Sequence, residues 1–230
     1  MIVVFYFLTG LAVGYFIGSF IESILHEYVS DAPAPWVRAW RRHPRLFRVP
    51  LNTYFSHHVI HHHQTFRRNH ITQFDSPDQR ARVDAVLLAR GRHGRIIMGG
   101  DYANRIHAEG GFVFALPALL SASILSLFLP AAMAIGSGLA LMLPPALSYW
   151  VHPYLHRSFA DGQKNAPAFV AFLLRTKYMK AVYRNHFMHH RYDGTSNYNL
   201  VLGADILRKR VRVPSSDDIR AMAEIGMPLD

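Results

Sequence analysis

The sequence predicts an all-α integral membrane protein, in which about three transmembrane helices carry a cytoplasmic, helical, histidine-rich cap that binds metal. Three observations lead to this prediction. Half of the 230 residues are hydrophobic although the formal net charge is +10, a combination that suits a membrane protein with one basic face. Two long stretches lack Asp, Glu, Lys and Arg, and the histidines cluster where those stretches end. We expect the whole chain, 1–230, to form one domain.

The first span is expected at about 2–25, which is long enough to cross a hydrocarbon core of about 30 Å. A cleaved signal peptide ending near residue 34 is the alternative, but no Lys or Arg precedes the stretch and its apolar run is too long. Gly10, Gly14 and Gly18 recur every fourth residue, so one face of the helix lets another helix approach closely. Another span of the same chain is the expected partner, and a homodimer contact is the alternative.

Residues 110–156 contain no Asp, Glu, Lys or Arg and are long enough for two spans, which we expect to fold back near Pro130 at about 111–129 and 132–151. All 25 Lys and Arg lie in the two remaining segments, 26–110 and 152–230. The positive-inside rule places both segments in the cytoplasm, with the N-terminus and the Pro130 turn on the other side.

Two amphipathic helices are expected within the cap. One begins after Ser76, with Pro77 in its first turn, and ends near Gly91; the other runs from Pro167 to about Tyr183. Their cations lie opposite an apolar face, which fits either the membrane interface or packing on a cytoplasmic domain. Because the membrane topology already accounts for the basic charge, no nucleic-acid partner is expected.

Four clusters of candidate metal ligands lie at the cytoplasmic ends of the spans or in the cap. They are His26 with Asp31, an H-x2-H-H unit (His58, His61, His62), an H-x3-H unit (His152, His156) and a second H-x2-H-H unit (His186, His189, His190). Residues three and four apart share one face of an α-helix, so each unit directs its imidazoles to one place. Ten donors are too many for one ion, and they predict two metal ions side by side.

The other histidines do not fit these spacings. His57 and His63 are expected to lie beside the ligands or at the surface, and a further set is expected to be solvated or hydrogen-bonded: His43, His70, His93 and His107. The chain has no cysteine, so any metal is held by nitrogen and oxygen, and an iron–sulfur electron donor has to be a separate protein. Imidazole suits zinc, copper, nickel and iron alike, so spacing does not choose among them.

In order along the chain, these motifs resemble the fatty acid hydroxylase/sterol desaturase superfamily of integral membrane di-metal oxygenases. That family's signature runs H-x4-H or H-x3-H, H-x2-H-H, H-x3-H, H-x2-H-H, with a membrane hairpin between the second and third motifs. The resemblance covers the chain to about Leu207, and it includes the run SNYNLVLGADIL after the last motif. It implies two iron ions that activate O2, with zinc able to occupy the site in isolated protein.

The first motif departs from the family pattern, because Asp31 stands where the second histidine is expected. A carboxylate can ligate iron, but Asp31 also suits the turn that ends the first helix. Glu22 lies four residues before His26, so it either accepts the other N–H of that imidazole or marks the interfacial end of the span.

By this resemblance the expected function is O2-dependent hydroxylation of an unactivated C–H bond in a lipidic or apolar substrate, with electrons from an external protein. Desaturation on the same scaffold shares the first hydrogen abstraction and stays open. A membrane metal transporter is the alternative from another class, although a transporter should place its ligands near the bilayer midplane. Incidental histidines in a structural membrane protein do not explain four ordered motifs.

Overall fold

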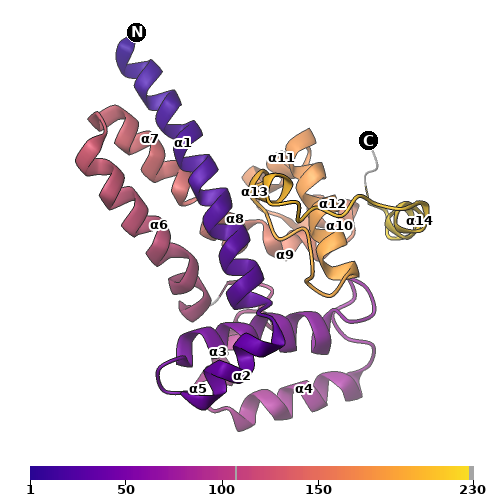
Figure 1. Ribbon diagram of the computed structural model, residues 1–230. Helices are drawn as coiled ribbons and strands as arrows, with labels where there is room; N and C mark the ends of the chain where they lie inside the picture. The colour runs from indigo at the N-terminus through magenta and orange to yellow at the C-terminus, as the bar shows by residue number, and fades with distance from the viewer. Residues whose placement is uncertain (107, 228–230) are drawn as a thin grey trace.

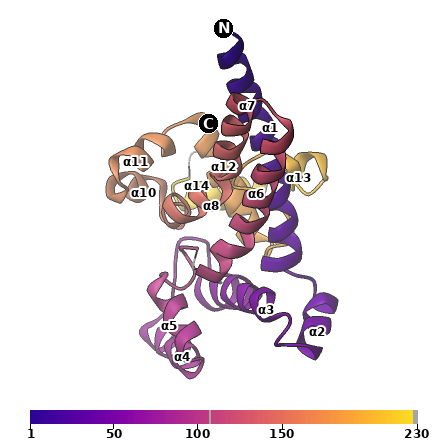
Figure 2. The same ribbon diagram turned by 90° about the vertical axis from the view of Figure 1, so that its left-hand side faces the viewer.

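The computed structural model describes residues 1–106 and 108–227, and within those ranges every regular element is helical. Three helices are long and apolar enough to cross a membrane: Ile2–Ser30, Glu109–Phe128 and Ala131–Trp150. They stand side by side, with the N-terminus and the turn at Pro130 toward one end (Figure 1). The remaining helices gather below and to one side of them (Figures 1 and 2). The three apolar helices and the hairpin of the prediction are therefore present.

The glycine stripe joins the first and third apolar helices. A Cβ atom placed on Gly10 of α1 (Ile2–Leu25) would lie 2.1 Å from the carbonyl oxygen of Met133 on α7 (Ala131–Leu141). On Gly14 it would lie 2.2 Å from the Ser137 carbonyl oxygen, and the Ser137 hydroxyl donates to the carbonyl of Gly10 at 3.0 Å. The expectation that the stripe faces another span of the same chain is confirmed.

The third apolar helix is interrupted near its middle. α7 ends at Leu141, and α8 (Leu143–Trp150) follows, with Pro144 in its first turn. Proline cannot donate a backbone hydrogen bond, so a helix restarts there more easily than it continues. α9 (His152–Leu155) then follows after Val151 and carries the H-x3-H unit, whereas α6 (Ala108–Phe128) stays one helix around Pro117.

The cap consists of short helices in two groups. The first comprises α2 (Ala34–Arg42), α3 (Arg48–Tyr54), α4 (Pro77–Ala89) and α5 (Arg92–Gly99). The second comprises α10 (Phe159–Asn165), α11 (Ala168–Leu174), α12 (Lys177–Arg191), α13 (Ala204–Leu207) and α14 (Ser216–Glu224). The expected helix after Ser76 is confirmed as α4: the Ser76 hydroxyl accepts from the Gln79 N–H, and Gly91 beyond its end has φ +60°.

The prediction of one helix from Pro167 to Tyr183 is wrong. α11 ends at Leu174, and Thr176 caps a new helix, α12, by accepting a hydrogen bond from the Met179 N–H. One side of α12 packs into an apolar core that includes Val182, Tyr183 and Met188. That core holds the histidine-bearing helix in place.

Two segments are π-helices: η1 (His26–Ser30), which continues α1, and η2 (Phe55–Thr65), which continues α3. Their backbone hydrogen bonds run over five residues, as from the Asp31 N–H to the His26 carbonyl at 2.8 Å. Residues five apart therefore share a face, which pairs His26 with Asp31 and His57 with His62. The α-helical spacing assumed for residues 57–63 is wrong, and this changes which histidines meet.

Candidate metal centre

Two groups of potential metal ligands lie next to each other where the apolar helices meet the cap. The five-histidine group consists of His61, His152, His156, His186 and His190, and the Asp31 group consists of His26, Asp31, His57 and His189. Within each group the ligand atoms lie within 4.8 Å of one another. The groups adjoin, since the rings of His57 and His61 stack at 5.3 Å and those of His186 and His189 at 6.0 Å between centroids.

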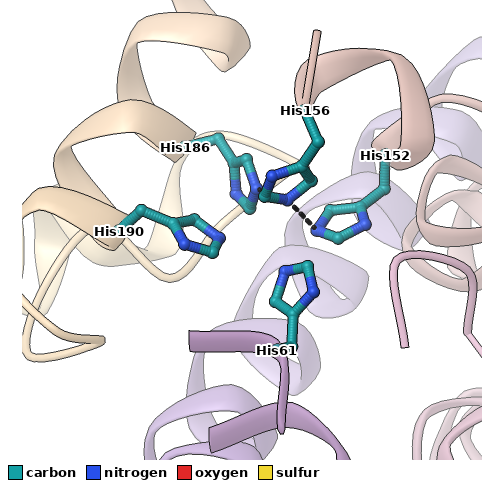
Figure 3. Close-up of side chains that lie close together, drawn as sticks. All are labelled: His61, His152, His156, His186 and His190. Atoms are coloured by element: carbon teal, nitrogen blue, oxygen red, sulfur yellow. Dashed lines mark hydrogen bonds between the residues drawn. The ribbon is translucent and has the colours of Figure 1, made fainter. Parts of the chain in front are cut away.

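The five-histidine group draws its side chains from three separate elements. η2 supplies His61, α9 and the residue after it supply His152 and His156, and α12 supplies His186 and His190 (Figure 3). All five are buried, and in Figure 3 the ring of His61 faces the other four. Within the described chain, both nitrogens of His61 and Nε2 of His190 are buried without a hydrogen-bond partner. Such groups are costly to bury unless something binds them.

The rings of His152 and His156 face each other through their Nε2 atoms. His152 Nδ1 donates to the Asn104 carbonyl and His156 Nδ1 to the His70 carbonyl, each at 2.6 Å. Those bonds place the proton of each neutral ring on Nδ1, so two Nε2 lone pairs face each other at 3.3 Å. Burial lowers the pKa of His152 to about 3 and the pKa of His156 well below its usual value, so neither ring is protonated near neutral pH. Two facing lone pairs attract a cation between them.

The spacing of the nitrogens fits a coordinated ion. Nε2 atoms of His156 and His186 lie 2.8 Å apart, and those of His26 and His57 lie 2.9 Å apart. Metal–nitrogen bonds of about 2.0–2.1 Å place neighbouring ligand atoms about 2.9–3.4 Å from each other. With no cysteine in the chain, these donors are borderline imidazoles and one hard carboxylate, a set that suits a first-row transition metal ion and does not choose among zinc, copper, nickel and iron.

The Asp31 group surrounds one carboxylate. Oδ2 of Asp31 lies 3.3 Å from Nε2 of His26 and 3.4 Å from Nε2 of both His57 and His189. Burial raises the pKa of Asp31, but the surrounding imidazoles outweigh burial and hold the pKa well below its usual range. Asp31 therefore faces the candidate ligands as an anion.

Backbone carbonyls orient the imidazole rings of the Asp31 group, as they orient His152 and His156 in the five-histidine group. His26 Nδ1 donates to the Tyr198 carbonyl at 2.6 Å, and His189 Nδ1 donates to the Ser196 carbonyl at 2.8 Å. Both rings then direct Nε2 toward Asp31. Metal-binding histidines are commonly held by such a bond from the other ring nitrogen.

The remaining histidines of η2 contact partners five residues away, as the hydrogen-bond period of a π-helix allows. His62 extends the Asp31 group, with Nε2 3.1 Å from Nε2 of His57 and 3.8 Å from Asp31 Oδ1. His58, expected as a ligand, is in neither group and instead donates from Nδ1 to Asp31 Oδ1 at 2.9 Å. His63 contacts His58, with their Nε2 atoms 3.2 Å apart. His57 thus takes the place predicted for His58.

Glu22 does not hold His26. Its carboxylate accepts from the backbone N–H groups of Leu200 and Val201 at 3.0 and 2.8 Å, and from the side chain of Asn199 at 3.2 Å. These bonds tie the 196–201 loop to α1. Glu22 therefore acts on the histidines indirectly, by fixing the loop whose carbonyls orient them.

The histidines expected outside the site behave in different ways. His43 is exposed as predicted, and His93 is partly buried with Nδ1 3.4 Å from Glu109 Oε2. His70 was expected to be solvated or hydrogen-bonded; it is buried, at 2 % exposed, and its backbone carbonyl accepts a hydrogen bond from His156. No spacing in the sequence marks it, because its contribution is a backbone atom. The prediction for His107 lies outside the described residues.

A small cavity of about 60 Å³ lies where both groups meet the apolar helices. Histidines of both groups line it, namely His26, His57, His152 and His186, and so do all three apolar helices, through Glu22, Phe114 and Ser148. No family model, curated protein sequence or solved structure gives a significant match to this chain.

Proposed function

We propose that the chain is a membrane di-iron oxygenase that hydroxylates an unactivated C–H bond of a lipidic or apolar substrate, using O2 and electrons from an external donor protein. The observation that carries the proposal is the pair of adjoining, buried, imidazole-rich groups at one end of three membrane-length apolar helices. The family resemblance of the histidine motifs supplies the reaction type.

Iron bound at the two groups would supply the activation of dioxygen. The protein's own part is to hold the ligands, and it does so with carbonyl acceptors from loops and helix ends, such as those of Asn104 and Tyr198. Burial of the rings keeps bulk water from the reacting centre, which would limit proton leakage and other side reactions there.

The cavity beside the two groups supports an apolar substrate. Phe114, Ile106 and Leu200 lie in its wall, and the cavity of about 60 Å³ suits a narrow group such as a segment of an acyl chain. A chain that approached between the apolar helices would present a methylene to both groups. This argument favours a lipid substrate over a polar one.

The electron donor would approach from the opposite side. A wider polar cavity of about 390 Å³ reaches His190 and is lined by Arg67, Arg68 and Arg191. Because the chain has no cysteine, it holds no thiolate-ligated cluster of its own, and an iron–sulfur electron donor would have to be a separate protein. Desaturation remains the alternative outcome of the same hydrogen abstraction.

The proposed topology puts the cap in the cytoplasm and the Pro130 turn on the other side, because the Lys and Arg residues lie in the cap segments. The chain has no native cysteine, so single cysteines can be labelled without background. Cysteines at Arg45 and Ser216, both exposed, should label only after the cells are opened, and a cysteine at Pro130, which is exposed in the turn between the second and third apolar helices, should label from outside. Labelling of the cap positions in intact cells would reject the topology.

The activity is tested by incubating iron-loaded protein with membrane lipid extract, O2 and a chemical reductant. A product heavier by one oxygen atom is expected, and a product lighter by two hydrogens would indicate desaturation. His156→Ala is the inactive control, and His43→Ala, which changes an exposed histidine, should keep activity. Iron-loaded protein that binds two ions and oxidises no lipid would refute the proposal.

A further inference from the structure

Apart from the two candidate metal-binding groups, a cavity of about 330 Å³ opens between α2, α3, η2 and the end of α4. Three arginines line it, Arg41, Arg48 and Arg90, together with Tyr54 and Phe55. We call it the arginine pocket. It shares no lining residue with the cavity beside the metal ligands.

Among the residues that the structure describes, the arginines of the arginine pocket are not engaged in ion pairs. In the described part of the chain, none of its three arginines lies within 4.0 Å of a carboxylate, whereas other arginines form ion pairs, for example Arg191 with Asp218 at 2.9 Å. The guanidinium of Arg90 sits over the ring of Phe55 at 3.3 Å from its centroid, which fixes its position at the pocket. Burial and the neighbouring charge of Arg41 both lower the pKa of Arg90, so these cations repel each other across the pocket.

The arginine pocket lies beside the cap end of an apolar helix. Asn52, which also lines it, donates from its side chain to Glu109 Oε2 at 2.7 Å, and Glu109 begins the Glu109–Phe128 membrane-length segment. Trp36 on neighbouring α2 is 50 % exposed, as aromatic side chains at a membrane interface often are. In a bilayer, phosphate groups lie at this level.

We propose that the arginine pocket binds a phosphate-bearing anion, whose source is either a phospholipid headgroup or a soluble phosphate compound. Guanidinium groups bind phosphate oxygens through paired N–H donors, and basic pockets at the ends of membrane helices recognise anionic headgroups. Three such groups around one cavity supply both the charge and the directed donors that a phosphate needs.

A ligand in the arginine pocket would lie next to the start of η2, the π-helix that carries His57 and His61. Tyr54 and Phe55 belong to the α3–η2 junction, and the ring of Tyr54 stacks on His58 at 4.9 Å between centroids. A bound anion would hold this junction in place, and the binding itself does not depend on the proposed oxidation.

Thermal denaturation of the full-length protein in maltoside micelles tests the proposal with three probes: dioctanoyl phosphatidylglycerol, inorganic phosphate, and dioctanoylglycerol, which lacks the phosphate. The phosphatidylglycerol should raise the melting temperature in a saturable way, and dioctanoylglycerol should not. Arg41→Gln and Arg90→Gln should weaken binding about tenfold, because each removes a charged hydrogen bond. Arg42→Gln and Arg82→Gln change exposed arginines outside the pocket and should bind like the native protein.

Stabilisation by the phospholipid alone identifies a headgroup, and stabilisation by inorganic phosphate identifies a soluble compound; either result supports the phosphate site. Equal stabilisation by dioctanoylglycerol, no stabilisation by any probe, or equal losses in Arg41→Gln and Arg42→Gln would overturn it. Should Arg41→Gln not fold, Arg41→Lys keeps the charge without the paired donors and should still bind more weakly than Arg42→Lys.

Discussion

The exchange of His57 for His58 as a candidate ligand gives the sharpest test of the site. His57 directs Nε2 to the Asp31 group, 3.4 Å from Asp31 Oδ2, whereas His58 donates a hydrogen bond to the other oxygen of the same carboxylate. An α-helical reading of H-x2-H-H requires the opposite roles. We therefore compare His57→Ala with His58→Ala.

His57→Ala should lose more metal affinity than His58→Ala. Four-ligand metal sites bind with about 10–16 kcal/mol, or about 3–4 kcal/mol per ligand, so removing His57 should weaken the ion at Asp31 by about a hundredfold to a thousandfold. Removing a group that only orients a ligand costs about tenfold to a hundredfold, which is the loss expected for His58→Ala. The five-histidine group should keep its ion in both variants.

Metal content after equilibration against graded chelator concentrations measures both losses. His57→Ala should fall from two ions to one at a chelator concentration that leaves His58→Ala with nearly two. His63→Ala is the matched control, because His63 is half-buried and contacts His58 rather than Asp31. If His58→Ala loses an ion at a lower chelator concentration than His57→Ala, His58 rather than His57 binds the metal, and the π-helical spacing of η2 does not determine the ligands.

Three further predictions concern charge, packing and pH. Asn suits the same turn as Asp, but Asp31→Asn removes the anion that faces three imidazoles, so the iron content of this variant should fall. Asp31→His should retain the metal. Unchanged iron content in Asp31→Asn would show that Asp31 serves only the turn. Gly14→Ala should destabilise by about 1–3 kcal/mol in thermal denaturation, because its Cβ would lie 2.2 Å from the Ser137 carbonyl, whereas Gly18→Ala has 3.5 Å of space and should be nearly neutral. Burial raises the pKa of Asp218, but hydrogen bonds from Ser215, Tyr192 and Arg191 outweigh burial and lower the pKa to about 2. The stability that ionised Asp218 contributes should therefore be present at neutral pH and be lost between about pH 4 and 2. Asp218→Asn should not show that loss of stability in acid.

The sequence predicts the coarse fold well because its signals are long. Uncharged stretches of membrane length, a hairpin at Pro130 and a glycine stripe each span many residues, and the structure contains all three. The break at Met142 and the separation of α11 from α12 depend on a single proline or threonine cap, so the predicted boundaries were off there. Local capping decides such details, and its signal is only one residue long.

The site was harder to predict because its period is unusual. H-x2-H-H suggests an α-helix, but residues 55–65 form a π-helix, and the relevant interval becomes five. That interval was visible: His26–Asp31, His57–His62 and His58–His63 all repeat it. The carbonyls of Asn104, His70 and Ser196 could not be inferred, because a backbone acceptor leaves no mark on residue type.

The two groups differ in charge, and this bears on how two ions would share the site. In the five-histidine group, burial and mutual repulsion lower the pKa of rings such as His61 and His190, so lone pairs are free near neutral pH. In the Asp31 group, burial lowers the pKa of His189, but its contact with Asp31 outweighs burial and raises the pKa. An ion there would be stabilised by the carboxylate of Asp31, which favours the more highly charged oxidation state. We therefore expect the ion at Asp31 to have the lower reduction potential, and the neutral five-histidine group to hold the ion that is reduced first.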